Sequence, residues 1–503
     1  MATIAESKDT KAQEPTKASD QPVVTTTPNN SSNTDSNTQV IDTQVIDSEF
    51  NRDNINALGN RIRITDKDEA AGLELLCYVR CTATDSSLLR QCRGVVFHGK
   101  KIVMHAFPYT VEYTDGDQDQ IKEHIEPVFD KCSFYDSYEG ALIRVFHFSG
   151  RWYTSTHRKL NAFRSKWSSR ESFGTCFKRA LESEVQTNPK LREAVPEGDE
   201  GLLERFQNTL DKNNQYMFLV RHTEENRIVS AAPETPTLFH VGTFIDGELS
   251  LDDDINIPYP RKHTFKDMGK LVGYVNDVDI RDLQGVICFA PDNKQYKIIQ
   301  QEYQDLFRAR GNEPSIKFRY LQVRMNRRFT DMLYHLYPKW EAKFDEIENT
   351  LYEIARNIYT AYVQRFIKKR FVTVPTEEFS VIRECHKWHE ADRTNNRISI
   401  DKVIETLNQQ SPTALNRMIR RFRNEKTAQK QNKTEAKQRA RSNTISSPAL
   451  AATVGSPPVQ SPLLLSQNRR RNPMIPPIPN LGPSALPARD SPHRSLLNND
   501  RKK

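Results

Sequence analysis

The 503-residue sequence predicts an α+β protein in which antiparallel sheets are followed by a helical region. Residues 141–148 are rich in β-branched and aromatic side chains, Ser149-Gly150 is a turn dipeptide, and residues 151–156 form a second such run, which predicts a β-hairpin. Later in the chain, apolar residues recur at steps of three and four, which predicts an amphipathic helix; they are Phe344, Ile347, Leu351, Ile354, Ile358 and Tyr362.

Composition divides the chain into four parts. Residues 1–55 are rich in Ser, Thr, Asn, Asp and Gln and are expected to be a disordered leader, because they offer little apolar surface to offset the entropy of ordering. A strand-rich domain is expected over residues 56–312 and a helical domain over 313–424. Residues 425–503 are expected to be a disordered, basic tail rich in Ser and Pro.

Charge is unevenly distributed along the chain. Residues 426–503 contain 14 Lys and Arg against 3 Asp and Glu, whereas residues 1–55 contain 4 against 9, so the middle carries only about +2 of the net charge of +8. The basic character therefore belongs mainly to the tail. Its Arg469, Arg470 and Arg471 are candidate RNA-binding residues, and its Ser-Pro dipeptides resemble phosphorylation sites that would weaken such binding.

Several classes of protein are not expected. The chain has no apolar run of the length of a membrane span and no signal-peptide pattern at its start, so no membrane association is expected. We expect a cytoplasmic location, which would be the host cytoplasm or a virion if the protein is viral. Seven scattered cysteines suit a reducing compartment. The segment Cys385-His386-Lys387-Trp388-His389 provides only three adjacent candidate ligands, so no metal site is predicted.

A four-residue motif stands directly before the predicted hairpin. Ser137-Tyr138-Glu139-Gly140 resembles the Lys-x-Asp/Glu-Gly signature of the covalent nucleotidyltransferases, which include RNA ligases, DNA ligases and capping enzymes. In that family the lysine amine attacks the α-phosphate of ATP or GTP. Here the lysine position is Ser137, and a hydroxyl is a poor substitute for an amine of lowered pKa. The resemblance implies the fold of that family without its reactive atom.

Further motifs follow in the order that the T4 RNA ligase 1-like family has them, in the style of RNA ligase-like proteins of large DNA viruses. Arg93-Gly94-Val95-Val96-Phe97 resembles the family's Arg-Gly-hydrophobic strand, and Asn226-Arg-Ile-Val229 resembles its Asn-Arg-Ile-Val segment. The resemblance implies a nucleotidyltransferase module, similar to the ATP-grasp type, of two antiparallel sheets around a cleft. It also implies a nucleotide pocket that contains Arg93, Glu139, Gly140, Val220, Gln284, Lys297 and Ile299.

At three of these pocket positions the family's charged side chain is replaced. Val220 stands where the family has a glutamate for the nucleotide sugar, Gln284 where it has a glutamate that attracts Mg²⁺, and Ile299 where it has a second lysine for the α-phosphate. Gly94, Gly140 and Gly285 persist. This pattern is expected if the fold is in use and the adenylation chemistry is not, so no cofactor is assigned; ATP and Mg²⁺ would be required if the protein were active.

The segment after the hairpin carries the candidate RNA-binding residues Lys159, Arg164 and Lys166, beside the aromatic residues Phe163 and Trp167. The other interpretation is a solvated basic helix start whose aromatic residues pack inward. Lys159 is also the candidate that could replace the missing nucleophile, because the second hairpin strand could bring it towards the same pocket.

Three functions remain open on the sequence alone. The first is a catalytically impaired RNA ligase-like protein that binds RNA, or a protein partner, through the former substrate surface, with the tails available for protein partners. The second is an active ATP-dependent RNA ligase that uses a non-standard lysine. The third is a viral structural or scaffold protein.

Overall fold

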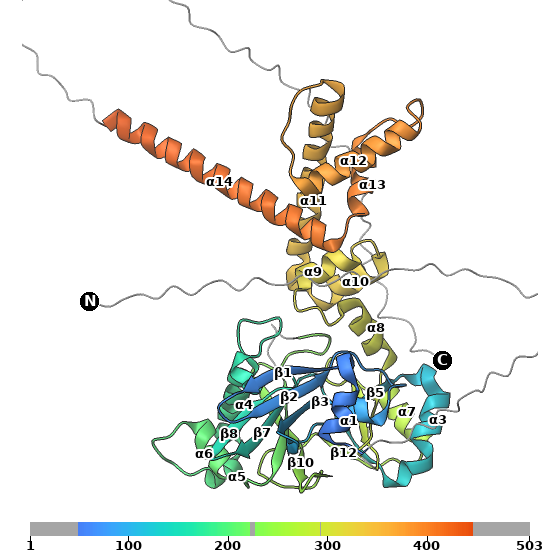
Figure 1. Cartoon of the computed structure of the whole chain (residues 1–503), viewed down its shortest axis with the longest axis vertical. Helices are drawn as coiled ribbons and strands as arrows, with labels where there is room; N and C mark the ends of the chain where they lie inside the picture. Colours follow the sequence, from blue (N-terminus) through green and yellow to red (C-terminus); the bar gives the residue numbers. More distant parts are fainter. Residues whose placement is uncertain (1–48, 222–226, 292, 446–503) are drawn as a thin grey trace, which may run out of the picture. The chain divides into compact units, whose positions relative to one another are not determined.

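The computed structural model of the chain describes residues 49–221, 227–291 and 293–445. Three β-sheets are formed by residues 62–299, and from residue 301 onward the described chain is helical (Figure 1). The predicted α+β class, with antiparallel sheets and a helical C-terminal region, is therefore confirmed. The expected number of sheets in the module was wrong, because a third sheet is present.

The N-terminal sheet has the strand order β1-β2-β3-β4, with all neighbours antiparallel. Its strands are β1 (Ile62–Asp68), β2 (Leu73–Tyr78), β3 (Arg93–His98) and β4 (Lys101–Met104). Helix α1 (Arg52–Ala57) packs Ile55, which has no exposed surface, against this sheet. The predicted leader, residues 1–55, was therefore too long, because α1 begins at Arg52 and Ile55 packs in a buried core.

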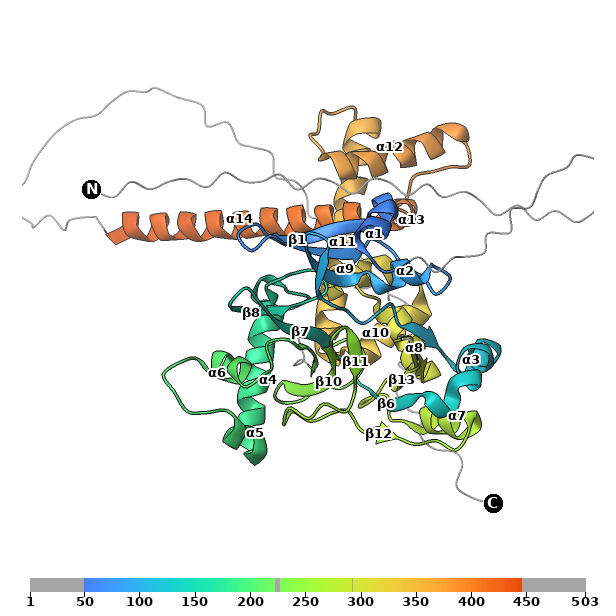
Figure 2. The ribbon, with the colours of Figure 1, turned by 60° about the horizontal axis from the view of Figure 1, so that its bottom comes forward.

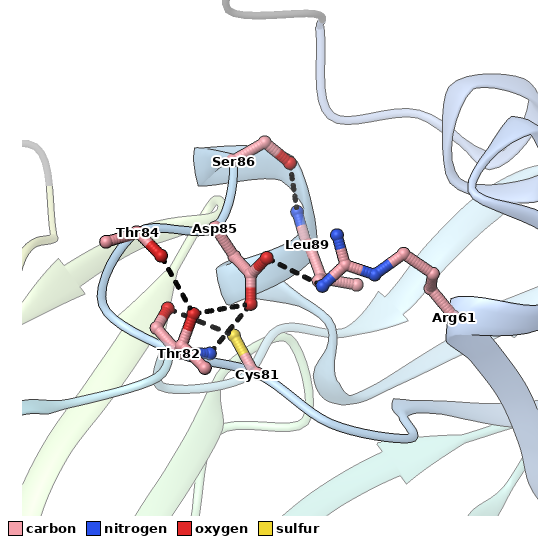
Figure 3. A network of polar contacts seen from close by, with 7 residues as sticks. All are labelled: Arg61, Cys81, Thr82, Thr84, Asp85, Ser86 and Leu89. Atoms are coloured by element: carbon pink, nitrogen blue, oxygen red, sulfur yellow. Dashed lines mark hydrogen bonds and ion pairs between the residues drawn. The ribbon is translucent and has the colours of Figure 1, made fainter. Parts of the chain in front are cut away.

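The loop between β2 and helix α2 (Ser87–Gln91) is held by one carboxylate (Figure 3). Asp85 accepts hydrogen bonds from the Thr82 backbone amide at 2.7 Å and the Thr82 hydroxyl at 3.0 Å, and Arg61 donates to it at 2.6 Å. Ser86 caps α2 by accepting from the Leu89 amide at 3.3 Å. These bonds fix the path of the chain just before Arg93, the first residue of β3.

The predicted hairpin is confirmed as β7 (Ala141–Phe148) and β8 (Arg151–Ser155), joined at Ser149 and Gly150, both of positive φ. It belongs to the hairpin sheet, whose order is β11-β10-β9-β7-β8. The other strands are β9 (Gln215–Arg221), β10 (Thr237–Ile245) and β11 (Glu248–Ser250). One face is covered by helices α4 (Phe173–Thr187), α5 (Pro189–Ala194) and α6 (Leu202–Asn208) (Figure 2).

The mixed sheet has the order β12-β6-β13-β14-β5, and only the β14 and β5 pair is parallel. Its strands are β5 (Val111–Tyr113), β6 (Ser133–Ser137), β12 (Lys262–His263), β13 (Gly285–Phe289) and β14 (Gln295–Ile299). Helices α3 (Gln118–His124) and α7 (Met268–Asp277) share a buried core with it. Short 3₁₀ turns complete this half of the chain; they are η1 (Gly59–Arg61), η2 (Asp115–Asp117), η3 (Glu126–Lys131) and η4 (Ala162–Arg164).

The helical region has its own core, which includes the predicted amphipathic helix as α11 (Glu341–Tyr362). Val229 and Ile299 join the same core and so connect it to the sheets. The other elements are α8 (Gln301–Arg310), α9 (Ile316–Val323), α10 (Arg327–Leu336), η6 (Pro338–Trp340), the π-helix η7 (Val363–Ile367), α12 (Thr376–Ala391), α13 (Ile400–Asn408) and α14 (Pro412–Ile445).

Ser399 caps α13, and Pro412 is the first residue of α14, both common residues at helix starts. The expected end of order near residue 424 was wrong, because α14 continues to Ile445. Residues 227–230 form no strand. The chain divides into two compact units, Met1–Ala428 and Gln429–Lys503, so α14 crosses their boundary.

Two further expectations concern membrane spans and cysteines. No helix in the described ranges combines the length and apolarity needed to cross a membrane. All seven cysteines are free thiols.

Gly285 provides a test of the fold. A Cβ on Gly285 would lie 2.1 Å from the Ile298 carbonyl oxygen, and the φ of +146° is unfavourable for other residues. Gly285→Ala should therefore lower the free energy of unfolding by at least about 2 kcal/mol, measured by thermal or urea denaturation. Gly273→Ala is the matched control, since Gly273 lies in α7 with open space around it and should gain up to about 1 kcal/mol. Equal effects would contradict this account.

Candidate functional site

The motif Ser137-Tyr138-Glu139-Gly140 connects the mixed sheet to the hairpin sheet. Ser137 is the last residue of β6 and pairs with Gly285, while Ala141 opens β7. Gly140 is required between them, because a Cβ there would lie 2.6 Å from the Val220 carbonyl oxygen. The side chains on either side of Gly140 consequently face the space between the two sheets.

Ser137 belongs to a continuous hydrogen-bond network. Its hydroxyl donates to Gln284 Oε1 at 3.3 Å, and Lys297 Nζ donates to the same oxygen at 3.1 Å. Gln284 Nε2 donates to the Tyr303 hydroxyl at 2.9 Å, and that hydroxyl donates to Glu139 Oε2 at 3.1 Å. Residues from β6, β14, α8 and the position just before β13 are thereby joined, and Lys297 is placed next to Ser137 by their shared acceptor.

Glu139 is the acceptor at the end of this network. Besides Tyr303, its carboxylate accepts the backbone amides of Ile228, Val229 at 2.8 Å and Ser230 at 3.0 Å. Hydrogen bonds to a charged acceptor are about twice as strong as neutral ones. Glu139 therefore holds the segment 228–230 against the hairpin sheet, and its oxygens are already occupied.

Lys297 has a perturbed environment. Burial is the main cause that lowers the pKa of its amine below the usual value, Glu112 on β5 opposes this change, and Arg93 adds to it. Lys297 on β14 and Glu112 on β5 lie opposite each other on these two paired strands. The amine is thus closer to its neutral, nucleophilic form than an exposed lysine would be.

An inner cavity of about 160 Å³ opens beside Ser137. Its walls are mainly apolar and aromatic, with Ser137, Gln284 and Lys297 at one side. Two of its lining residues, Tyr135 and Gln295, each have a buried polar atom, Oη and Nε2, without a hydrogen-bond partner within the described residues. Unsatisfied buried polar atoms are costly and uncommon in folded proteins.

A second, larger hollow of about 420 Å³ adjoins the cavity through Arg93, Gly140 and Leu142, which line both. We call it the basic groove. Its cationic lining residues are Arg93, Arg158, Lys166, Arg221 and Arg227. Among the described residues, Glu139 is the only carboxylate in the lining, and it is already engaged, so cations outnumber free carboxylates in this part of the groove.

Four of the five cations in the groove have no carboxylate partner among the described residues. In the part of the chain that the structure describes, no carboxylate forms an ion pair with Arg93, Arg158, Lys166 or Arg221. The groove also includes Trp167, and the Arg310 guanidinium lies 5.3 Å from the centre of its ring. Phosphate groups together with a stacked ring would fit this lining.

The structure brings together most of the residues that the motifs indicated. Arg93, Glu139, Gly140, Gln284 and Lys297 all line the cavity or the groove, as does Ser137.

Two pocket residues implied by the motifs lie elsewhere. Val220 is fully buried in the core under the helices of the hairpin sheet, and Leu219 faces the cavity instead. Ile299 is packed in the core of the helical region. The position of Val220 follows from strand alternation, since neighbouring residues on a strand face opposite sides of the sheet. Ile299 is the last residue of β14, where the chain enters the helical region, and it packs there.

The basic segment after the hairpin is only partly in the groove. Lys166 and Trp167 line it, whereas Arg164 lies in η4 outside the lining. Lys159 forms a bridge with Thr156 and an ion pair of 3.5 Å with Asp66 of β1, so it lines neither hollow. This position is unfavourable for a replacement nucleophile, because the tight turn at 156–159 directs the lysine towards the N-terminal sheet.

Sequence reasoning missed several contributors to the site. Arg158 and Arg221 belong to no motif, so the sequence assigned them no role. Tyr135 and Gln295 carry no motif signal at all, because the isolation of a buried polar atom is visible only in three dimensions. Arg469, Arg470, Arg471 and Asn226 lie outside the described residues.

The carboxylates near the cavity do not suit a metal ion. Asp136 accepts from His263 at 2.7 Å and from Tyr274 at 2.8 Å, Glu139 is engaged as above, and Gln284 is neutral. Across the described ranges, no three His, Cys, Asp or Glu side chains gather as a metal site would require. His386 instead packs on Phe366, with ring centres 3.9 Å apart, and Cys385 donates to Thr406.

The fold and site define an α+β protein with a cavity and a basic groove between antiparallel sheets. No protein-family profile matches the chain. It is 26% identical over 373 residues to the "Immediate-early protein ICP-46 homolog" of Invertebrate iridescent virus 6, covering 69% of this chain and 80% of that protein. It is 28% identical to the protein of the same name in Invertebrate iridescent virus 3, covering 66% and 73%. The "Immediate-early protein ICP-46" of Frog virus 3 is 25% identical, covering 49% and 62%.

Solved structures similar to this chain are ligases. An archaeal ATP-dependent RNA ligase matches with a TM-score of 0.32 and 12% identity, covering 56% of this chain and 67% of the ligase. A protein assigned as an ATP-dependent DNA ligase in Aquifex aeolicus matches with a TM-score of 0.31 and 13% identity, covering 62% and 78%. These TM-scores are low, so the relation to ligases continues to depend on the sequence motifs.

The Glu139 network makes a prediction about stability. Glu139→Gln should lower the free energy of unfolding by about 2 to 3 kcal/mol, because the amide nitrogen that replaces one oxygen cannot accept from backbone N–H groups. Urea denaturation measures the change. Glu302→Gln on the exposed face of α8 is the control and should change stability by less than about 0.5 kcal/mol. An unchanged free energy of unfolding in Glu139→Gln would contradict the assigned role.

Proposed function

We propose that this chain is an RNA ligase-related protein that binds RNA in the basic groove and does not form a covalent lysyl-nucleotide. The observation that supports this proposal is that two features lie next to each other in the site. The position that corresponds to the nucleophilic lysine holds Ser137, while the adjoining groove has four cations that pair with no carboxylate of the described residues.

The chemistry around Ser137 supports the absence of covalent transfer. A serine hydroxyl needs a base to become a nucleophile. Its hydrogen bond goes to the amide oxygen of Gln284, which is a weak base, and the nearest carboxylate in the network is bound by backbone amides. Asp136 and Glu139 are both engaged and Gln284 is neutral, so these residues offer no free carboxylate to the Mg²⁺ that a nucleotidyltransferase would use.

The groove supports RNA as the ligand. Lys and Arg side chains bind phosphates, and binding releases counterions, so affinity falls as the salt concentration rises. A guanidinium such as Arg158 or Arg221 can bind a phosphate through two N–H groups. Trp167 offers a ring for stacking on an unpaired base. A single-stranded segment therefore suits the groove better than a rigid duplex.

Exchanging groove cations tests RNA binding. The double variant Arg158→Gln with Lys166→Gln should bind a labelled single-stranded RNA about tenfold more weakly, and its slope of log affinity against log salt should be smaller by about 1.4. Fluorescence anisotropy at several salt concentrations measures both quantities.

The control for this experiment removes the same charge elsewhere. Lys122 and Lys131 are exposed and lie outside the groove, so Lys122→Gln with Lys131→Gln should change affinity and slope much less. Equal losses in the two double variants would mean that only the net charge matters. A wild-type chain without salt-dependent RNA binding would refute the proposal and favour a scaffold role.

A second candidate function is nucleotidyl transfer through a relocated lysine. Lys297 favours it, because its amine shares an acceptor with Ser137, lines the inner cavity and has a lowered pKa. Lys159, the candidate suggested by the sequence, is paired with Asp66 instead. The amine of Lys297 is therefore the lysine to test first.

A labelling experiment separates the two functions. Incubation of the protein with ATP or GTP carrying a radioactive α-phosphate, together with Mg²⁺, should give no labelled protein band, while an active ligase labelled in parallel confirms the assay. A band that survives in Lys159→Ala and disappears in Lys297→Met would refute the non-covalent proposal. It would identify Lys297 as the nucleophile.

A further inference from the structure

A short segment of the helical region combines exposed apolar and cationic side chains. Residues 367–371, which we call the basic-apolar loop, have the sequence Ile-Lys-Lys-Arg-Phe and follow the π-helix η7 at the end of α11. Phe371 is 92% exposed and Ile367 is 65% exposed. Such exposure of a phenylalanine removes no apolar area from water, so folding alone does not explain it.

The backbone of the loop is held in one shape. The Lys368 amide donates to the Val363 carbonyl at 2.9 Å, and the Arg370 amide donates to the Gln364 carbonyl at 2.9 Å. Lys369 has a φ of +51°, a left-handed conformation that is uncommon for residues other than glycine. The fold therefore maintains an unfavourable backbone in order to present exposed side chains, which is typical of binding sites.

The base of the loop is anchored by neighbouring side chains. The Phe366 ring lies 3.9 Å from the His386 ring and 5.0 Å from the Tyr362 ring, measured between centres. The Arg365 guanidinium lies 4.9 Å from the Phe379 ring. The residues before the loop thus pack inward, while the five residues of the loop are exposed.

The charge of the loop points to an anionic partner. No Asp or Glu within the described residues forms an ion pair with Lys368, Lys369 or Arg370. The acidic residues that begin α12, Glu377 and Glu378, are occupied by Arg421. Three adjacent unpaired cations beside an exposed aromatic ring match the alternation of phosphates and bases in a single nucleic-acid strand.

We propose that the basic-apolar loop is a second contact for single-stranded RNA, in which Phe371 stacks on a base and Lys368, Lys369 and Arg370 bind the flanking phosphates. This inference rests on the proposed RNA-binding function and adds a contact outside the groove. The cations outnumber the apolar side chains in the loop, which favours a phosphate backbone over the apolar interior of a membrane.

Two substitutions of Phe371 distinguish stacking from plain apolar burial. In the full chain, Phe371→Leu keeps an apolar side chain and removes the ring, so binding of a fluorescein-labelled 30-nucleotide oligouridylate should weaken about tenfold. Phe371→Trp should bind at least as tightly as the wild type, and addition of unlabelled RNA should quench its added tryptophan fluorescence. Met325→Ala, at another exposed apolar residue, is the control and should leave affinity unchanged.

The charges are tested by salt dependence. Replacement of Lys368, Lys369 and Arg370 together by Gln should reduce the slope of log affinity against log salt by about 2, at about 0.7 per phosphate contact. The matched control replaces Lys122, Lys190 and Lys339 by Gln; all three are exposed and removed in sequence from the loop. Its slope should stay close to that of the wild type.

The outcomes are separable. If the wild type binds RNA but the Phe371 and triple-Gln variants match it, the loop proposal is wrong and the groove function stands. If the wild type shows no salt-dependent RNA binding, the function itself is wrong. If Phe371→Leu keeps full affinity, and the wild type but not the triple-Gln variant sediments with vesicles containing phosphatidylserine, the loop binds anionic membrane and the RNA contact is refuted.

Discussion

The carboxylate of Glu139 is the constraint on which the site depends. It gathers backbone amides from residues 228–230 and the hydroxyl of Tyr303, and therefore joins the turn between two sheets to the first helix of the helical region. A carboxylate removed from water is tolerated only when its oxygens are satisfied. These distant segments must consequently fold around it together, and their agreement fixes the walls of both the cavity and the groove.

The same network occupies the polar side chains around Ser137. Ser137 and Lys297 both donate to Gln284, and Gln284 in turn donates to Tyr303. The cations of the groove lie outside this network, and among the described residues four of them have no carboxylate partner.

The positive charge that matters is placed on loops and strand ends, whereas Lys159 is neutralised by Asp66. Residues 56–425 carry a net charge of only about +2, so a count of charges does not reveal the groove. Among the described residues, Arg93, Arg158, Lys166 and Arg221 gather around it without carboxylate partners. The basic-apolar loop follows the same rule at a smaller scale, since Lys368, Lys369 and Arg370 also lack carboxylate partners among the described residues.

By itself the sequence determined the features that depend on local chemistry. The hairpin at Ser149-Gly150, the apolar stripe of α11 and the cap at Ser399 follow from periodicity and turn preference, and Gly140 and Gly285 followed from motif order. Only the tertiary structure decided which face of a strand points to the cavity, and it places Leu219, not Val220, in the cavity wall. It also decided where Lys159 points and which buried atoms lack partners, because these properties depend on neighbours that are far apart in the chain.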